Sequence, residues 1–361
     1  MGSGCICSKK SQSSPSHAHT IPPTHPLSNI SLLETKKRQN WLIPLKSFEY
    51  FQNPLSRFFN QQPGNFKRLT IEGPPSDMRW EVWKTLFQSK SQPIPTDLIP
   101  SEFMSLIEKD LERTFPGHPF FMNQFHLQSL KELLINTVRL NPELGYCQGM
   151  NSVAGVFLLV SSNNVTESSF MMHTFIHKYA GKGLFEPNFP KVLELLTLFN
   201  KVFKARIPAL FNHFQEIELD DHFWISKWFM TLFSYSFKLE AVIRFWDAIF
   251  VNGVNSMISI SIGILTELKK ELEGRDLGSV LEFLSKLRNL DLRFEEIILS
   301  CNRAFSCQEM GKGRKEKGME RIRLELSPDV ATEISLKGDE VEGRKRANSL
   351  IIQHSPRSPN I

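Results

Sequence analysis

The sequence has few cysteines, and none of them form a C-x-x-C pair. Its five cysteines are an odd number, which argues against a framework of disulfides and against a structural zinc site. They are Cys5, Cys7, Cys147, Cys301 and Cys307. We therefore interpret the chain as an intracellular protein.

Long apolar runs are also missing. The best candidate, Met257 to Leu265, is short and is interrupted by two serines and a glycine. A membrane-spanning helix needs about 20 apolar residues. The N-terminus is polar and lacks the apolar core of a secretory signal. We expect neither a membrane-spanning nor a secreted protein.

A large excess of one charge is lacking, and so are nucleotide-binding motifs. The chain has 43 Lys and Arg against 38 Asp and Glu, a net charge of +5, which is too balanced for a protein that coats nucleic acid. No G-x-x-x-x-G-K-[ST] loop occurs, and no glycine-rich dinucleotide motif lies in a strand–helix context. We expect no nucleic-acid partner, no cofactor and no nucleotide site within this chain.

One pair of histidines has the spacing of a metal pair. His173 and His177 lie one helical turn apart, but no Glu follows His173 as zinc proteases require, and no third ligand suggests itself. We interpret them as a packed or surface pair and expect no metal site.

Aromatic residues are plentiful, and their distribution outlines one domain. All 29 phenylalanines fall between Phe48 and Phe305, so both ends lack the material of a core. The predicted divisions are a disordered segment over 1–40, an irregular lead-in over 41–65 with one short helix near 48–59, a domain over 66–290, a helical or basic linker over 291–326 and a disordered tail over 327–361.

Inside the domain, apolar residues recur at helical spacing. Leu127, Leu130 and Leu134 form one such stripe, and residues 192–203 carry another. The stretch Ile258 to Ile264 instead alternates with period two, which by itself predicts a strand. The sequence therefore predicts a helical domain with one ambiguous segment.

The loop between two apolar helical segments, Leu140 to Asn151, stands out. Pro142 ends the preceding helix, and Gly145 and Gly149 bracket Gln148 with residues that tolerate unusual backbone angles. A helix connector with an incidental glutamine would explain this composition as well. Its neighbours in the sequence favour a functional loop.

Three ordered motifs carry a resemblance to a known family. G-P-P-x-x-x-R-x-x-x-W runs over 73–83, I-x-x-D-x-x-R-T-x-P over 107–116 and Y-C-Q-G-M-N over 146–151. In this order and spacing they resemble the signature motifs of the TBC-domain family, whose members are known as GTPase-activating proteins for Rab GTPases. Residues 228–233 and 244–247 also look like later helices of that family, so the resemblance covers about 66–290.

The resemblance implies an all-α fold of a dozen or more helices in two packed subregions, with disordered tails, and it therefore favours a helix at 258–264. It implies that Arg113 is an arginine finger and that Gln148 orients the attacking water. Asp110 lies one turn before Arg113 and is expected to orient it, although an ordinary ion pair is the alternative. Supporting roles are expected for Tyr146, packed beneath the loop, for Asn151, a polar anchor at the next helix start, and for Arg79 with Trp83, in mutual contact.

The implied function is acceleration of GTP hydrolysis by a Rab-type GTPase in membrane trafficking. The partner would bring GTP and magnesium, so the chain would be an activator and not an enzyme by itself. One alternative is a non-catalytic TBC scaffold that binds a GTPase without stimulating it. Another is a membrane-tethered binding module.

The two ends carry candidate modification sites. Gly2 could accept a myristoyl chain and Cys5 and Cys7 palmitoyl chains, ahead of two lysines, although the usual motif has Ser or Thr where this chain has Ile6. We expect attachment to the cytosolic face of a membrane. Near the other end, the surrounding Arg and Pro residues suit phosphorylation. These sites are Ser349, Ser355 and Ser358.

Overall fold

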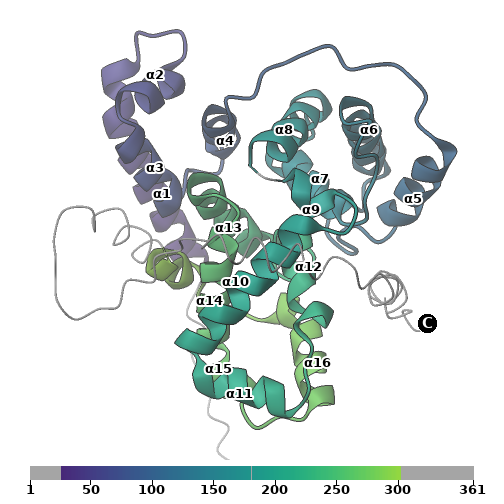
Figure 1. Ribbon diagram of the computed structural model, residues 1–361. Helices are drawn as coiled ribbons and strands as arrows, with labels where there is room; N and C mark the ends of the chain where they lie inside the picture. Colours follow the sequence, from purple (N-terminus) through teal and green to yellow (C-terminus); the bar gives the residue numbers. More distant parts are fainter. Residues whose placement is uncertain (1–25, 180, 302–361) are drawn as a thin grey trace, which may run out of the picture.

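A computed structural model describes residues 26–179 and 181–301, with side chains from residue 32 (Figure 1). These residues form helices and loops and contain no strand, which confirms the all-α prediction. The α-helices are α1 (Pro26–Leu45), α2 (Pro54–Gln61), α3 (Pro63–Glu72), α4 (Arg79–Phe87), α5 (Ser101–Leu111), α6 (Gln124–Leu140), α7 (Met150–Val160), α8 (Val165–Lys178), α9 (Lys182–Phe185), α10 (Pro190–Arg206), α11 (Pro208–Glu216), α12 (Ile225–Met230), α13 (Leu239–Asn252), α14 (Ser256–Glu267), α15 (Lys269–Leu272) and α16 (Leu277–Ser285). Short 3-10 helices are η1 (Lys46–Phe48), η2 (Asp221–Phe223) and η3 (Leu287–Asn289), and residues 294–301 are also helical.

The helices pack in two subregions, as predicted. In Figure 1, α4 to α9 lie in the upper part, where α6, α7 and α8 contact one another, and α10 to α16 lie below them. Helix α13 joins the parts because it packs against α3, α4 and α14. The core between these helices is rich in aromatic rings. Phe157 of α7, for example, packs against Trp246 and Phe250 of α13.

The ambiguous stretch at 258–264 is helical and lies within α14. This confirms the helix that the family resemblance favoured, and the strand that the alternation alone suggested is wrong. Ile258, Ile260, Ser261 and Ile264 are all buried, and the helix packs against α10 and α13. A helix covered on several sides has no polar face, so the spacing of its apolar residues does not reveal its period.

Helix α1 corrects the prediction of disorder over 1–40, because residues 26–40 are helical. Its anchor is Trp41, which is fully buried and meets the rings of Phe58 and Phe66 edge-on at 6.2 and 5.2 Å. The expected irregular lead-in over 41–65 is in fact the end of α1 followed by η1, α2 and the start of α3. Lys37 and Arg38 add ion pairs with Glu295 and Asp77, so α1 is held to the domain by an aromatic anchor and by charged contacts.

None of the described helices combines the length and the apolar character required to cross a bilayer.

Candidate functional site

The site forms where the end of α5 meets the start of α7. Helix α5 ends at Leu111, and the chain turns through Glu112 to Pro116, so that Arg113 lies just beyond the helix on the same side as Asp110. The Arg113 side chain is 42% exposed, whereas that of Asp110 is 4% exposed. The guanidinium therefore sits at the surface, above a buried carboxylate.

The buried carboxylate of Asp110 binds the guanidinium of Arg113. Both Nε and one terminal nitrogen of Arg113 donate hydrogen bonds to Oδ1 of Asp110, the first at 2.8 Å. These two bonds use two of the five N–H donors of a guanidinium, and the other donors of Arg113 have no partner among the described residues. The expected contact between Asp110 and Arg113 is present.

The second oxygen of Asp110 is bound from the glutamine loop. The Tyr146 hydroxyl donates to Oδ2 at 2.6 Å, and the tyrosine is buried, as predicted. Burial and then the neighbouring Asp110 charge raise the pKa of Tyr146, so the hydroxyl stays protonated and can donate. One carboxylate thus joins the segment of Arg113 to the segment of Gln148.

A second link runs through Asn151 in the first turn of α7. Its Nδ2 donates to the hydroxyl of Thr114 at 2.8 Å, and its Oδ1 accepts the N–H of Gly149 at 3.1 Å. The Thr114 hydroxyl in turn donates to the backbone oxygen of Asp110 at 2.6 Å. Asn151 is therefore the polar anchor that was predicted, and Thr114, which the sequence reading did not single out, is its partner.

Gln148 is presented to solvent by the loop. It is exposed, and its side chain makes no hydrogen bond to another described residue. Gly145 and Gly149 have φ values of +68° and +104°, in the region that favours glycine. A Cβ at Gly145 would lie 2.4 Å from the ring of Phe103 in α5, so the loop also lies tightly against that helix.

The thiol beside Gln148 is a poor nucleophile. Burial, followed by the Asp110 charge, raises the pKa of Cys147 to about 12. A thiol is reactive only as the thiolate, and at neutral pH this cysteine is protonated. The loop therefore offers an amide and not a covalent catalyst.

Arg79 and Trp83 meet through a third residue that the sequence analysis did not predict. Asp247 of α13 is fully buried. Its Oδ1 accepts hydrogen bonds from Nε of Arg79 at 3.3 Å and from Nε1 of Trp83 at 2.7 Å. Arg79 also donates to the backbone oxygen of Pro74. The predicted pair of Arg79 and Trp83 is thus linked through a shared carboxylate, and this group supports the fold without a hydrogen bond or ion pair to Arg113 within the described chain.

Arg244 extends this buried cluster to both ends of the described chain. It pairs with Asp247 and donates two hydrogen bonds to Glu295 at 3.0 and 2.8 Å. Lys37 of α1 contacts the same Glu295 at 3.2 Å. The R-x-W-D spacing at 244–247 was a usable signal for Arg244 and Asp247, whereas no local pattern points to Lys37 or Glu295.

His173 is partly buried and His177 is exposed, and their ring centres lie 4.4 Å apart, which agrees with the predicted packed or surface pair. A ring nitrogen of each lies at 3.0 and 2.9 Å from Oδ1 of Asn141, at the base of the glutamine loop. No cluster of three or more His, Cys, Asp or Glu side chains in the described part of the chain is arranged to hold a metal ion.

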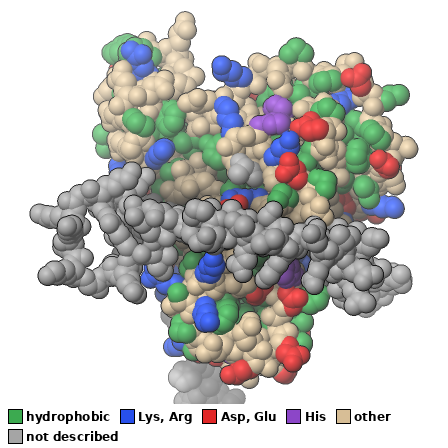
Figure 2. Space-filling view, viewed as in Figure 1, with side chains coloured by type: hydrophobic (Ala, Val, Ile, Leu, Met, Phe, Trp, Pro, Cys, Tyr) green, Lys and Arg blue, Asp and Glu red, His purple; other side chains and the backbone are tan. Residues whose placement is uncertain are grey.

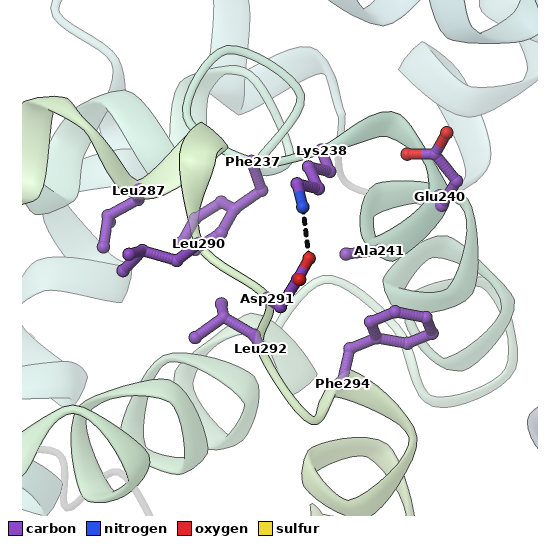
Figure 3. A pocket seen from close by; sticks show the side chains of 9 residues that line it. All are labelled: Phe237, Lys238, Glu240, Ala241, Leu287, Leu290, Asp291, Leu292 and Phe294. Atoms are coloured by element: carbon purple, nitrogen blue, oxygen red, sulfur yellow. Dashed lines mark hydrogen bonds and ion pairs between the residues drawn. The ribbon is translucent and has the colours of Figure 1, made fainter. Parts of the chain in front are cut away.

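A cavity of about 40 Å³ lies elsewhere, between α13 and the segment after α16 (Figure 3). Its wall is mainly apolar, with an ion pair between Lys238 and Asp291 at one side. None of its lining residues belongs to the three motifs. The predicted modification sites Gly2, Cys5, Cys7, Ser349, Ser355 and Ser358 lie outside the described residues.

The fold is similar to solved TBC structures. The Chlamydomonas flagellar RabGAP TBC domain superposes with a TM-score of 0.58 at 18% sequence identity, covering 78% of this chain and 96% of that one. The Ypt/Rab-GAP domain of Gyp1p gives a TM-score of 0.59 at 18% identity, covering 71% of this chain and 98% of that one.

Sequence comparison agrees with the fold. "GTPase-activating protein GYP5" of Saccharomyces cerevisiae is 26% identical over 260 residues, which cover 71% of this chain and 28% of the relative. "TBC1 domain family member 1" of Homo sapiens is 31% identical over 240 residues, which cover 61% of this chain and 20% of the relative. The chain thus spans less than a third of the length of these relatives. Residues 76–273 match the Rab-GTPase-TBC domain. With more than half of its sequence matched, the chain belongs to the Rab-GTPase-TBC domain family.

Proposed function

We propose that this domain accelerates GTP hydrolysis by a Rab-type GTPase, by placing Arg113 and Gln148 in the nucleotide site of its partner. The relatives support this proposal, since GYP5 is named a GTPase-activating protein. The observation that carries it is the bridge from Arg113 through Asp110 to Tyr146, which ties the exposed guanidinium to the loop that presents Gln148.

The proposal fits the needs of the reaction. Negative charge spreads over the oxygens of the phosphoryl group in the transition state, and a GTPase alone neutralises it incompletely. A guanidinium supplied by a second protein adds a planar set of donors and lowers the barrier, which raises the rate by about 10³ to 10⁵. Arg113 keeps donors free for this task while Asp110 fixes its orientation.

Gln148 would act on the water. A carboxamide both donates and accepts hydrogen bonds, so one group can hold the attacking water and contact the protein backbone of the partner. Gln148 is exposed and unpaired within the described chain, which leaves both functions available. GTP and magnesium would come with the GTPase, and the domain would contribute side chains alone.

Single-turnover GTP hydrolysis across a panel of Rab proteins tests the proposal. The unmodified chain should accelerate at least one Rab, and Arg113→Ala, Arg113→Lys and Gln148→Ala should each remove most of the acceleration. Lysine should fail because it lacks the planar fork of donors. Arg206→Ala, at an exposed arginine on α10, is the matched control and should remain active.

A binding measurement separates the non-catalytic alternative. Affinity for the GTPase in a transition-state-mimicking nucleotide state should fall in Arg113→Ala and Gln148→Ala and stay unchanged in Arg206→Ala. If the chain binds a Rab tightly but neither the unmodified chain nor the variants accelerate GTP hydrolysis by that Rab, the chain is a scaffold and the proposed mechanism is rejected.

A further inference from the structure

Helix α1 carries apolar side chains on two opposite faces. One face carries Trp41 into the core. The other, which we call the outer face, carries Leu32, Lys36, Gln39, Ile43 and Lys46, spaced by three or four residues so that they align along α1 and η1. Leu32 and Ile43 are 68% and 69% exposed. A solvated helix face is normally polar, so two large apolar side chains this exposed, set among lysines, give the face a mixed apolar and basic character.

The exposed apolar side chains continue into the turn between α1 and α2. Six large ones occur between residues 32 and 51, and Tyr50 is 92% exposed. They are Leu32, Leu33, Leu42, Ile43, Tyr50 and Phe51. Figure 2 shows hydrophobic and basic side chains on the projecting part that α1, α2 and α3 form at its upper left.

Cations without carboxylate partners lie among these side chains. Lys36, Lys46 and Arg57 make no ion pair within the described chain, and Arg57 lies 4.7 Å from the ring centre of Phe51. Lys37 and Arg38, on other faces of α1, are instead paired with Glu295 and Asp77. The outer face itself carries no Asp or Glu, although Glu49 is exposed in the following turn.

We propose that the outer face of α1, together with Tyr50 and Phe51, docks on a membrane surface that contains anionic lipids. Apolar side chains would enter the interface while Lys36 and Lys46 reach the headgroups with their amino groups. Aromatic rings such as Tyr50 favour the same boundary. The cations argue for lipid over a second apolar helix, since a dry helix–helix contact would leave them desolvated and unpaired.

This docking leaves the candidate site accessible. In Figure 1, α1 to α3 lie at one side of the molecule and α5, which leads to Arg113, lies at the other. The proposal depends neither on acylation of the N-terminus nor on GTPase activation.

Flotation with lipid vesicles tests the proposal on the full chain. The protein carries Gly2→Ala, Cys5→Ser and Cys7→Ser, so that no acyl chain can attach it. It should float with vesicles of phosphatidylcholine and phosphatidylserine, float poorly with phosphatidylcholine alone, and dissociate as salt rises. No binding to the anionic vesicles would overturn the proposal.

Matched variants show whether α1 is responsible. Lys36→Glu with Lys46→Glu should weaken partitioning at least about 30-fold, since each cation near an anionic surface contributes about 1 kcal/mol. Lys201→Glu with Lys270→Glu changes the net charge equally, at exposed lysines elsewhere that make no ion pair among the described residues. This pair should have little effect on partitioning. If both double variants lose the same amount of vesicle binding, net charge alone attracts the chain to the membrane, and the assignment of the outer face as the docking surface is wrong.

The apolar contribution has its own pair of variants. Ile43→Glu should weaken binding strongly, while Leu98→Glu, at a side chain that is 96% exposed in the loop before α5, should not. Circular dichroism should show the same melting temperature for all variants, because every substituted side chain is exposed. Binding that survives Ile43→Glu unchanged would contradict insertion of α1.

Discussion

The Tyr146 hydroxyl donates a 2.6 Å hydrogen bond to Oδ2 of Asp110, whose other oxygen holds Arg113. This relationship couples two segments that are more than thirty residues apart in the sequence. It means that the orientation of the guanidinium depends on the glutamine loop, and that a change in the loop reaches Arg113 without touching it.

Tyr146→Phe should therefore lower activation of the GTPase. The substitution keeps the ring and removes the donor, which leaves Oδ2 of the buried Asp110 without its partner. We expect a loss of about 1–3 kcal/mol in the free energy of unfolding, measured in urea, together with slower single-turnover hydrolysis. Tyr179→Phe removes a partly buried hydroxyl that donates to the backbone oxygen of Leu86, outside the three motifs, and should leave hydrolysis unchanged.

Thr114→Val should remove the other hydrogen-bonded link between the end of α5 and the start of α7. The hydroxyl of Thr114 joins the backbone of Asp110 to Asn151, and valine has the same shape without the hydroxyl. We expect a lower maximal rate of activated hydrolysis with little change in the GTPase concentration that gives half of it. Thr114→Ser restores the hydroxyl and should restore the rate. If serine and valine behave alike, the hydrogen bonds do not matter.

Asp247→Ala should destabilise the fold far more than an exposed acidic substitution. Arg79, Trp83 and Arg244 all bind this fully buried carboxylate, and removal of one member of a buried pair costs about 3–5 kcal/mol. Chemical denaturation measures the change. Asp77→Ala breaks an exposed pair with Arg38 and should cost less than about 1 kcal/mol. Similar losses in the two variants would contradict a structural role for the buried cluster.

The folded chain should lose stability as the pH falls below about 6.5. Burial, and then the charge of His177, lower the pKa of His173 in the folded state, although Glu143 acts in the opposite direction. As the pH falls, the unfolded chain therefore binds the proton before the folded chain does, and acid favours unfolding until the pKa of the folded state is passed. For one group the free energy of unfolding falls by at most about 1.4 kcal/mol per pH unit. Burial lowers the pKa of His118 as well.

Denaturation in urea between pH 7.5 and 5.5 measures this slope. His173→Gln, which keeps an amide donor near Asn141, should flatten the curve, and His126→Gln is a control at a histidine elsewhere in the chain. A variant at position 173 with the same slope as the original chain would show that His173 does not contribute.

Helical periodicity predicted several helices, and the family resemblance implied the all-α fold with two subregions and the residues of the candidate site. The resemblance carried by the three motifs implied roles for Arg113, Gln148, Asp110, Tyr146 and Asn151, because each of these residues lies within a motif of a few consecutive residues. Ser261 and its isoleucine neighbours were misleading by pattern alone, since full burial removes the polar face on which helical periodicity depends.

Other features could not be predicted because they depend on residues far apart in the sequence. Helix α1 mixes polar and apolar residues without a clear stripe, and its anchoring contact, Trp41 with Phe58 and Phe66, joins residues far apart in the sequence. Asp247 is recognisable as the partner of Arg79 only when α4 and α13 are side by side. The link from Thr114 to Asn151 likewise becomes visible only once the end of α5 lies against α7.

Glu295 has a practical consequence for anyone who shortens this protein. A fragment cut to residues 76–273, the span that matches the family, would keep Arg244 and discard both Glu295 and Lys37. The Arg244 guanidinium would then lose Glu295, one of its two carboxylate partners, and would face the surface opened by the cut. A fragment that keeps this cluster of charges intact must therefore begin before Lys37 and end after Glu295, outside the homologous segment.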